Sequence, residues 1–342
     1  MSIRFFLLFF VAAIFVGCNK KHDKTQSQVV SMKASVDTIV PLDMCAYPIQ
    51  IEKVGNHLVV LDLGNKTQCL LAYSLDGELI QRFGNVGHAA NEVSDVSHFF
   101  KMDEHRISVS KPGGVLFFNL DSLDGSNYQY EYKRMERTPV SVHDMYVDSL
   151  GVLCFLNSTE DRFSYTNEEG HTVAYNDYPE ASVDDLNDQQ AIFNYAPRFA
   201  VDMKNKRFCM GTYIGGIFET FQISSNGIEP LGKNILFKSN YKKFDNGAVS
   251  WEKESKIGFD AISTGEKHIY TLLSGAQGDC LLKGDQTSFT DKITVFNWDA
   301  TLHSEVHVGH NMLSMCVSEE QKEIYAICYK QGESFYLIRA TW

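Results

Sequence analysis

The segment Tyr73-Ser-Leu-Asp-Gly77 recurs in loosely similar form four more times along the chain. Each copy begins with an aromatic residue, follows a run of alternating apolar and polar residues, and leads through a polar or glycine-rich turn into another run. Such alternation is typical of β-strands, so each copy predicts a hairpin within a repeated sheet. The other copies are Phe118-Asn-Leu-Asp-Ser122, Tyr165-Thr-Asn-Glu-Glu-Gly170, Phe221-Gln-Ile-Ser-Ser-Asn-Gly227 and Phe296-Asn-Trp-Asp-Ala300.

Repetition at this spacing predicts a β-propeller. Strand-like runs group into five units of four strands and a last unit of only three. Residues 35–42 form a strand-like run with no hairpin partner, and adding it to the last unit closes the ring. We therefore predict an all-β fold, a six-bladed β-propeller of four-stranded antiparallel blades closed by an N-terminal strand, over residues 35–342. The units span residues 49–83, 98–133, 142–175, 198–236, 257–308 and 312–341.

The N-terminus predicts export. Arg4 precedes an apolar run over residues 5–16 that is short for a transmembrane helix and typical of a signal peptide. The run ends at Phe15-Val-Gly-Cys18, which resembles the lipobox of bacterial lipoproteins. That resemblance implies cleavage after residue 17, acylation of Cys18 and attachment to a membrane of the cell envelope. Residues 18–34 are polar and predict a flexible, lipidated tether.

The net charge of −12 is spread along the chain without basic blocks. An acidic chain lacking a basic stripe disfavours nucleic acid as a partner. It also disfavours electrostatic adhesion to an anionic membrane, so the lipid on Cys18 is the only expected membrane contact.

The eight cysteines do not form a disulfide or zinc pattern. Once Cys18 is acylated, an odd number remains, and Cys154, Cys209 and Cys328 lie inside apolar strand runs. Cys316 and Cys328 fall on adjacent strands, where a three-residue loop at 321–323 would place them opposite each other and a two-residue loop would leave them off register. We predict that these thiols are buried and reduced.

The segment between the first two units, Phe83-Gly-Asn-Val-Gly-His-Ala-Ala-Asn-Glu-Val93, carries a family resemblance. It is similar to the inter-blade segment of the TolB-like and NHL-type six-bladed propellers, although Ala90 and Asn91 stand where Pro-Gly is usual. The resemblance implies the same fold and export to the cell envelope. It does not imply a particular activity.

In an antiparallel blade, the first-to-second and third-to-fourth turns share one end, here called the turn face. Second-to-third loops and inter-blade links share the other end, here called the loop face. All long insertions, at 84–97, 178–197, 237–256 and 275–292, fall on the loop face, where binding sites usually lie. Their aromatic and charged residues suit a polar, ring-bearing ligand. The candidate ligand-binding residues are Glu92, Tyr178, Tyr195, Arg198, Tyr241, Lys243, Trp251, Asp279 and Lys283.

Motifs of common enzymes are absent, including GxSxG, HExxH, the P-loop and the dinucleotide fingerprint. His303, Glu305 and His307 alternate on one predicted outer strand, where a polar surface explains them better than a metal site. Carboxylates and imidazoles on first strands would line the central channel. Those candidates are Glu52, His98, Asp144 and Asp260.

Two functions follow from these observations. The leading hypothesis is a lipid-anchored, exported propeller that binds a ligand or partner through its loop face, without catalysis, cofactor or metal. The alternative is a metal-assisted hydrolase or lyase with its site in the central channel, as in some NHL-type and lactonase-like propellers. Metal analysis of the purified protein distinguishes the two hypotheses.

Overall fold

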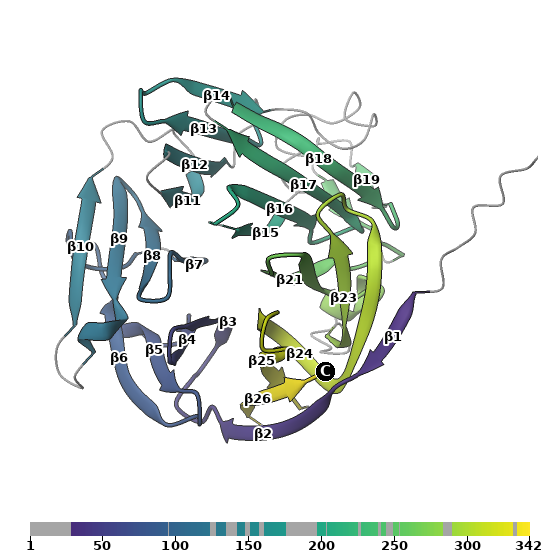
Figure 1. Cartoon of the computed structure of the whole chain (residues 1–342), viewed down its shortest axis with the longest axis horizontal. Helices are drawn as coiled ribbons and strands as arrows, with labels where there is room; N and C mark the ends of the chain where they lie inside the picture. The colour runs from purple at the N-terminus through teal and green to yellow at the C-terminus, as the bar shows by residue number, and fades with distance from the viewer. Residues whose placement is uncertain are drawn as a thin grey trace, which may run out of the picture.

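The computed structural model describes residues 29–342, except 95, 124–127, 135–141, 148–150, 157–160, 176–196, 203, 225–226, 239–240, 244–248, 253, 283–288 and 331–333. Four separate four-stranded antiparallel sheets and one eight-stranded sheet stand around a common axis (Figure 1). The eight-stranded sheet contains the fifth and sixth blades. In every blade the first strand lies nearest the axis. The predicted six-bladed propeller is therefore confirmed.

The first four blades end within two residues of the predicted units, because their alternation and turn residues are clear. Blade one comprises β3 (Pro48–Val54), β4 (His57–Asp62), β5 (Gln68–Ser74) and β6 (Leu79–Asn85). Blade two comprises β7 (Phe99–Lys101), β8 (Arg106–Lys111), β9 (Gly114–Asn119) and β10 (Gln129–Arg134), with the 3₁₀ turn η1 (Leu120–Ser122). Blade three comprises β11 (Val142–Val147), β12 (Gly151–Leu156), β13 (Phe163–Asn167) and β14 (Thr172–Tyr175). Blade four comprises β15 (Pro197–Asp202), β16 (Arg207–Thr212), β17 (Ile217–Ser224) and β18 (Gly227–Ile235).

Blades five and six share one long strand, β24 (Leu302–Ser318), where the sequence predicts two. Its first half pairs with β23 (Thr290–Asn297) and its second half with β25 (Glu323–Tyr329). Gly309 has a φ of +79°, a conformation that favours glycine, so the chain passes between blades without a loop. Blade five also contains β21 (Phe259–Thr264) and β22 (His268–Leu273), and blade six contains β26 (Phe335–Thr341) and β2 (Ser35–Pro41).

The predicted ring closure is confirmed. Strand β2 pairs antiparallel with β26, with Ser35 opposite Thr341 and Val36 opposite Ala340. The Leu42 N–H then donates to the Phe335 carbonyl at 2.7 Å. The Leu42 side chain is buried in a cluster that joins blade six to blade one.

A strand within the predicted tether corrects its boundary. Residues Val30–Lys33 form β1, which pairs parallel with β24, so that Val30 lies opposite Ser304 and Lys33 opposite His307. The Ala34 N–H donates to the His307 carbonyl at 2.9 Å. The outer edge of blade five offers unpaired backbone groups, which explains why so polar a segment is ordered. The propeller therefore begins before Ser35.

Three of the recurring turn segments share one geometry. In the first copy, the Gly77 N–H donates to the Ser74 carbonyl and the Ser74 N–H to the Glu78 carbonyl, at 3.0 and 2.8 Å. Equivalent bond pairs close the turns at Asn167 and Asn297. The aromatic residue that opens each copy is buried. Each copy therefore supplies a core side chain and a third-to-fourth turn, as predicted.

The inter-blade segment 83–93 owes its shape to its glycines. Gly84 has a φ of +68° and packs on Leu70, while a Cβ on Gly87 would lie 2.0 Å from Glu92 Oε2. That carboxylate accepts the Ala89 N–H at 2.9 Å. Glu92 therefore closes its own loop.

The predicted core thiols Cys154, Cys209 and Cys328 are buried, and the seven cysteines of the described residues are all unpaired. The hairpin that joins Cys316 to Cys328 is longer than the two- and three-residue loops that the sequence left open. Ser318 pairs with Glu323 across a four-residue turn, so Cys328 lies opposite Met312 and Cys316 opposite Tyr325.

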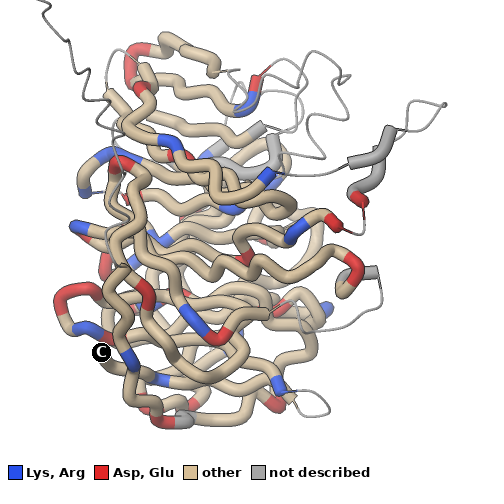
Figure 2. The backbone as a smooth tube through the Cα atoms, turned by 90° about the vertical axis from the view of Figure 1, so that its right-hand side faces the viewer, with Lys and Arg blue, Asp and Glu red and all other residues tan. Residues whose placement is uncertain are grey.

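Acidic and basic residues alternate along the side of the propeller without a segregated stripe (Figure 2). Within the described ranges, no helix has the length and apolar character needed to cross a membrane.

Candidate functional site

The inner strands β3, β7, β11, β15, β21 and the second half of β24 surround the axis (Figure 1). Side chains join neighbouring inner strands by bonding their backbones. Gln50 of β3 donates to the Phe99 carbonyl of β7 at 2.8 Å and accepts its N–H at 2.9 Å. Ser314 and Ser263 accept N–H groups of the next blade in the same way. These bonds satisfy strand edges that would otherwise be open and fix the channel wall.

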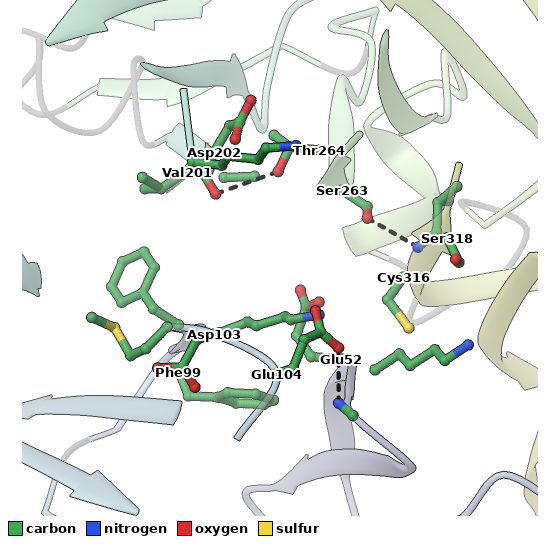
Figure 3. Close-up of a pocket in the computed structure, with 18 of the residues that line it drawn as sticks. Glu52, Phe99, Asp103, Glu104, Val201, Asp202, Ser263, Thr264, Cys316 and Ser318 are labelled. Atoms are coloured by element: carbon green, nitrogen blue, oxygen red, sulfur yellow. Dashed lines mark hydrogen bonds and ion pairs between the residues drawn. The ribbon is translucent and has the colours of Figure 1, made fainter. Parts of the chain in front are cut away.

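A cavity of about 980 Å³ occupies the channel on its turn-face side (Figure 3). Inner strands of five blades and several first-to-second turns contribute to its wall. The charged residues of the lining are Glu52, Lys53, Lys101, Asp103, Glu104, Arg106, Asp202, Lys204, Lys206 and Glu320. The apolar residues include Leu75, Phe100, Met102, Val201, Ile262 and Val317.

Glu52 projects from β3 into this cavity (Figure 3). Burial raises the pKa of its carboxyl to about 7, opposed by Lys101 and by a hydrogen bond with Gln50. Desolvation disfavours the charged form of an acid, and here it outweighs both neighbours. Glu52 can therefore change charge near neutral pH.

The thiol of Cys316 also lines the cavity, close enough to Glu52 for the two charges to interact. Burial raises the pKa of Cys316 well above its usual value, and Glu52 adds to the effect. Because the thiolate is the reactive form, Cys316 is a poor nucleophile.

A second group of polar side chains lies at the loop-face end of the channel. The Arg198 guanidinium lies over the Tyr213 ring, 4.7 Å from its centroid, and Arg198 Nε donates to the Asp260 carbonyl at 3.2 Å. Arg198 is the second residue of β15, Tyr213 follows β16 and Asp260 is the second residue of β21, which places all three on this face. Burial raises the pKa of Asp260 to about 7, against the effect of Arg198. Its Oδ2 atom is buried without a hydrogen-bond partner.

Tyr47, on the link from β2 to β3, contributes from the opposite side of the ring. It is 55% exposed, and its hydroxyl is near enough to raise the pKa of Tyr213, an effect smaller than those of burial and Asp260. We call Tyr47, Arg198, Tyr213 and Asp260 the mouth cluster.

The structure does not bring the predicted binding residues together in one site. Arg198 lies in the mouth cluster, whereas the Glu92 carboxylate accepts a hydrogen bond from the Ala89 N–H within its own loop. Asp279 begins the short helix α2 (Asp279–Leu282). Tyr241 pairs with Trp251, and Lys243 with Val249, in the hairpin of β19 (Tyr241–Lys243) and β20 (Val249–Trp251). Cys18, Tyr178, Tyr195 and Lys283 lie outside the described residues.

Of the predicted channel residues, Glu52 and His98 line the cavity, Asp260 lies in the mouth cluster, and Asp144 is on inner strand β11. On the outer strand, His303 stacks on His268 with centroids 4.2 Å apart, and Glu305 pairs with Lys292 at 2.7 Å. Within the described part of the chain, no group of three or more His, Cys, Asp or Glu residues is placed to hold a metal ion.

Sequence reasoning missed Tyr47, Tyr213 and Lys101. Tyr47 and Tyr213 lie just outside strand ends on the loop face, so extending the loop-face rule to short connections would have found them. Lys101 follows Phe99 by two residues on β7, and nothing in its local sequence distinguishes it from an exposed lysine.

The protein is therefore a six-bladed β-propeller with polar groups at both ends of its central channel. The chain belongs to the TolB-like 6-blade propeller-like family, whose model matches residues 20–320. The resemblance read from residues 83–93 is thereby confirmed. No curated protein matches the chain.

Several solved structures are similar to this chain at low sequence identity. A candidate exported protein of Bacteroides fragilis NCTC 9343 has 11% identity and a TM-score of 0.54, covering 91% of this chain and 98% of that protein. A duf4221 family member of Bacteroides vulgatus has 10% identity and a TM-score of 0.48, with 92% and 97% covered. Raptor of Chaetomium thermophilum has 11% identity and a TM-score of 0.51, with 91% and 29% covered. Identities this low bear on the fold alone.

Proposed function

We propose that this protein is an exported, lipid-anchored propeller that binds a ligand or partner at its loop face without catalysis. The observation that carries the proposal is the mouth cluster. Arg198 presents an exposed guanidinium beside an aromatic ring, and the Asp260 carboxyl next to it has a buried oxygen without a hydrogen-bond partner. A donor fork, an acceptor and an aromatic face together suit a polar ligand that carries a ring.

Binding explains the described groups better than catalysis does. The channel thiol Cys316 has a raised pKa, and no enzyme motif occurs in the sequence. The alternative is a metal-assisted hydrolase or lyase with its site in the channel. Such an enzyme would use Glu52 and His98, which line the cavity. The described residues offer these two no third ligand of the His, Cys, Asp or Glu type. Elemental analysis of the purified protein, at one metal per chain, would favour the alternative.

Export and anchoring rest on the first 18 residues. The positive start, the apolar run and the lipobox-like end at Cys18 support a lipoprotein. The Bacteroides fragilis protein that shares the fold is itself a candidate exported protein.

A thermal-shift screen tests the loop-face site. Nucleosides, monosaccharides and aromatic amino acids are compared on the wild type, Arg198→Ala and Tyr213→Ala. A ligand at 100 times its Kd stabilises by about 2.7 kcal/mol, which is about 4 °C for a chain of this size. We expect both variants to lose that shift, while Lys66→Ala, an exposed cation on the same face, keeps it. A ligand that shifts all four proteins equally would contradict the loop-face site.

A further inference from the structure

The turn-side cavity is separate from the mouth cluster. None of the four mouth residues is among the described residues that line it. Phe199, which follows Arg198 in the chain, packs on His98 of the cavity lining with ring centroids 5.1 Å apart, and His98 also packs on Phe100 at 4.8 Å. The volume of about 980 Å³ is within the usual range for small-molecule sites.

Most cations in the cavity already have acidic or polar partners. Lys101 Nζ pairs with Glu104 Oε1 at 2.5 Å, and Arg106 pairs with Asp103 at 2.8 Å. Lys53 contacts Glu323 at 3.3 Å and the Gln321 side chain at 2.5 Å.

Charged residues at the rim of the cavity are also paired. Lys204 pairs with Glu266 at 3.4 Å, and the acid Asp202 pairs with Arg207 at 2.8 Å. An anionic ligand would therefore have to displace an existing carboxylate to reach Lys53, Lys101, Arg106 or Lys204.

Glu52 differs from these acids. Among the described inner-strand residues that line the cavity, it is the carboxyl without an ion pair. Its polar neighbours are Gln50 on the same strand, Lys101 on β7 and Cys316 on β24, and Lys53 also acts on Cys316. Lys101 is committed to Glu104. Glu52 is half-buried, and a partly desolvated carboxylate without a full partner is costly, so a cation entering the cavity would be stabilised there.

Apolar side chains line the same space. Phe100, Val201, Ile262 and Val317 come from four different blades. They offer a surface for the uncharged part of a ligand whose cationic end reaches Glu52.

We propose that the turn-side cavity is a second ligand site that takes a small organic amine, with Glu52 pairing to the ammonium group and the apolar wall holding the hydrocarbon part. This site is independent of the loop-face site. Binding requires ionised Glu52, whereas without a ligand a pKa of about 7 leaves roughly half of this carboxyl protonated at neutral pH. Amine binding therefore displaces a proton from Glu52.

Isothermal titration calorimetry with phenethylamine tests the site, with 2-phenylethanol and 3-phenylpropionate as neutral and anionic analogues. We expect the amine to bind about 10- to 100-fold more tightly than either analogue, and Glu52→Gln to remove that preference. Because an aliphatic ammonium stays charged to about pH 9, the pH dependence reports Glu52. The Kd should be about 30 times larger at pH 5.5 than at pH 8 in the wild type, and independent of pH in E52Q.

Three further variants keep the test specific. Glu320→Gln removes an exposed carboxylate at the rim and should bind phenethylamine as the wild type does. Val201→Phe fills the cavity without touching Glu52 and should weaken binding of all three compounds. Arg198→Ala should leave phenethylamine binding unchanged, which separates this site from the loop face. Circular dichroism confirms that each variant is folded.

Equal affinities for the amine and its analogues would overturn the proposal. So would an unchanged affinity or pH dependence in E52Q, or a V201F variant that binds phenethylamine like the wild type. Loss of binding in R198A would place the amine at the mouth cluster instead.

Discussion

The Arg162 guanidinium and the Glu219 carboxylate form an ion pair of 2.6 Å between blades three and four, with side chains only 4% and 8% exposed. Arg162 lies just before β13, and Glu219 is on β17. Burying either charge without a partner would be costly, and the ion pair compensates part of that cost for both. The aromatic core beside them, including Phe163, Phe208 and Phe221, fills the same inter-blade space.

Arg162→Met should destabilise the protein by about 3–5 kcal/mol, because it leaves Glu219 buried without its partner. The double variant R162M/E219L should recover most of that loss, since two apolar side chains of similar size need no counter-charge. Urea unfolding of both variants measures the difference. Equal stabilities for the single and double variants would show that the ion pair is not what matters there.

Removing residues 1–42 should lower the melting temperature strongly, whereas removing residues 1–29 should not. The longer deletion takes β2 from β26 and takes Leu42 from the cluster between blades six and one. Loss of a buried leucine side chain alone costs about 2–5 kcal/mol. Thermal unfolding of the two truncations is the measurement. Similar melting temperatures would contradict this closure of the ring.

Stability should depend on pH through Glu52. Its folded pKa of about 7 lies above the ordinary value of 4.5, so the folded state holds this proton more tightly than the unfolded state does. The stabilising effect is complete below about pH 4.5 and is lost as the pH rises through 7. Relative to E52Q, the wild type should lose about 1–3 kcal/mol between pH 4.5 and pH 8. Urea unfolding at both pH values tests this, and E320Q should behave as the wild type.

The cysteines should all be reduced. Denatured, unreduced protein should show seven modifiable thiols by mass spectrometry once Cys18 is acylated. In the native protein, Cys154 should react slowly, because burial raises its pKa to about 12. The half-buried Cys45 and Cys280 should react first. A count of five in the denatured protein would reveal a disulfide.

Cys18→Ser should release the protein from the membrane fraction, since the predicted lipid is its only membrane contact. Cys45→Ser is the matched control and should stay with membranes. Fractionation of cells that express each variant, followed by immunoblotting, gives the answer. A C18S protein that still sediments with membranes would rule out anchoring through this residue.

The blades could be predicted from sequence because their information is local. Alternation sets each strand, and the recurring turn segment, such as Tyr73–Gly77, sets the hairpin that follows. The closing strand was predicted because the last unit lacked a fourth member. Strand β1 was not, because its order comes from the edge of β24, more than 270 residues away. The sequence also predicted an interruption between the strands of blades five and six, after residue 308. The structure has one continuous strand there, because Gly309 adopts a backbone conformation that lets β24 continue.

The candidate site was harder to predict, because it depends on contacts across the ring. The alternation of turns and loops along each blade predicted Arg198 on the loop face. The order of the strands predicted Glu52, His98 and Asp260 on inner strands. Neither could show that Glu92 would bond to its own loop, or that Lys101 would be committed to Glu104 beside Glu52. Tyr47 and Tyr213 come from blades on opposite sides of the axis, so only the closed ring brings them near each other.

The position of β1 determines how a tethered propeller would meet its surroundings. Its first residue lies beside Ser304, just after the third-to-fourth turn of blade five, so the chain enters at the circumference on the turn-face side. Twelve residues, 18–29, span at most about 43 Å when fully extended. With Cys18 in a bilayer, the disc would hang from a single point on its edge rather than from its hub. Both openings of the central bore would then stay free for molecules diffusing along the membrane surface.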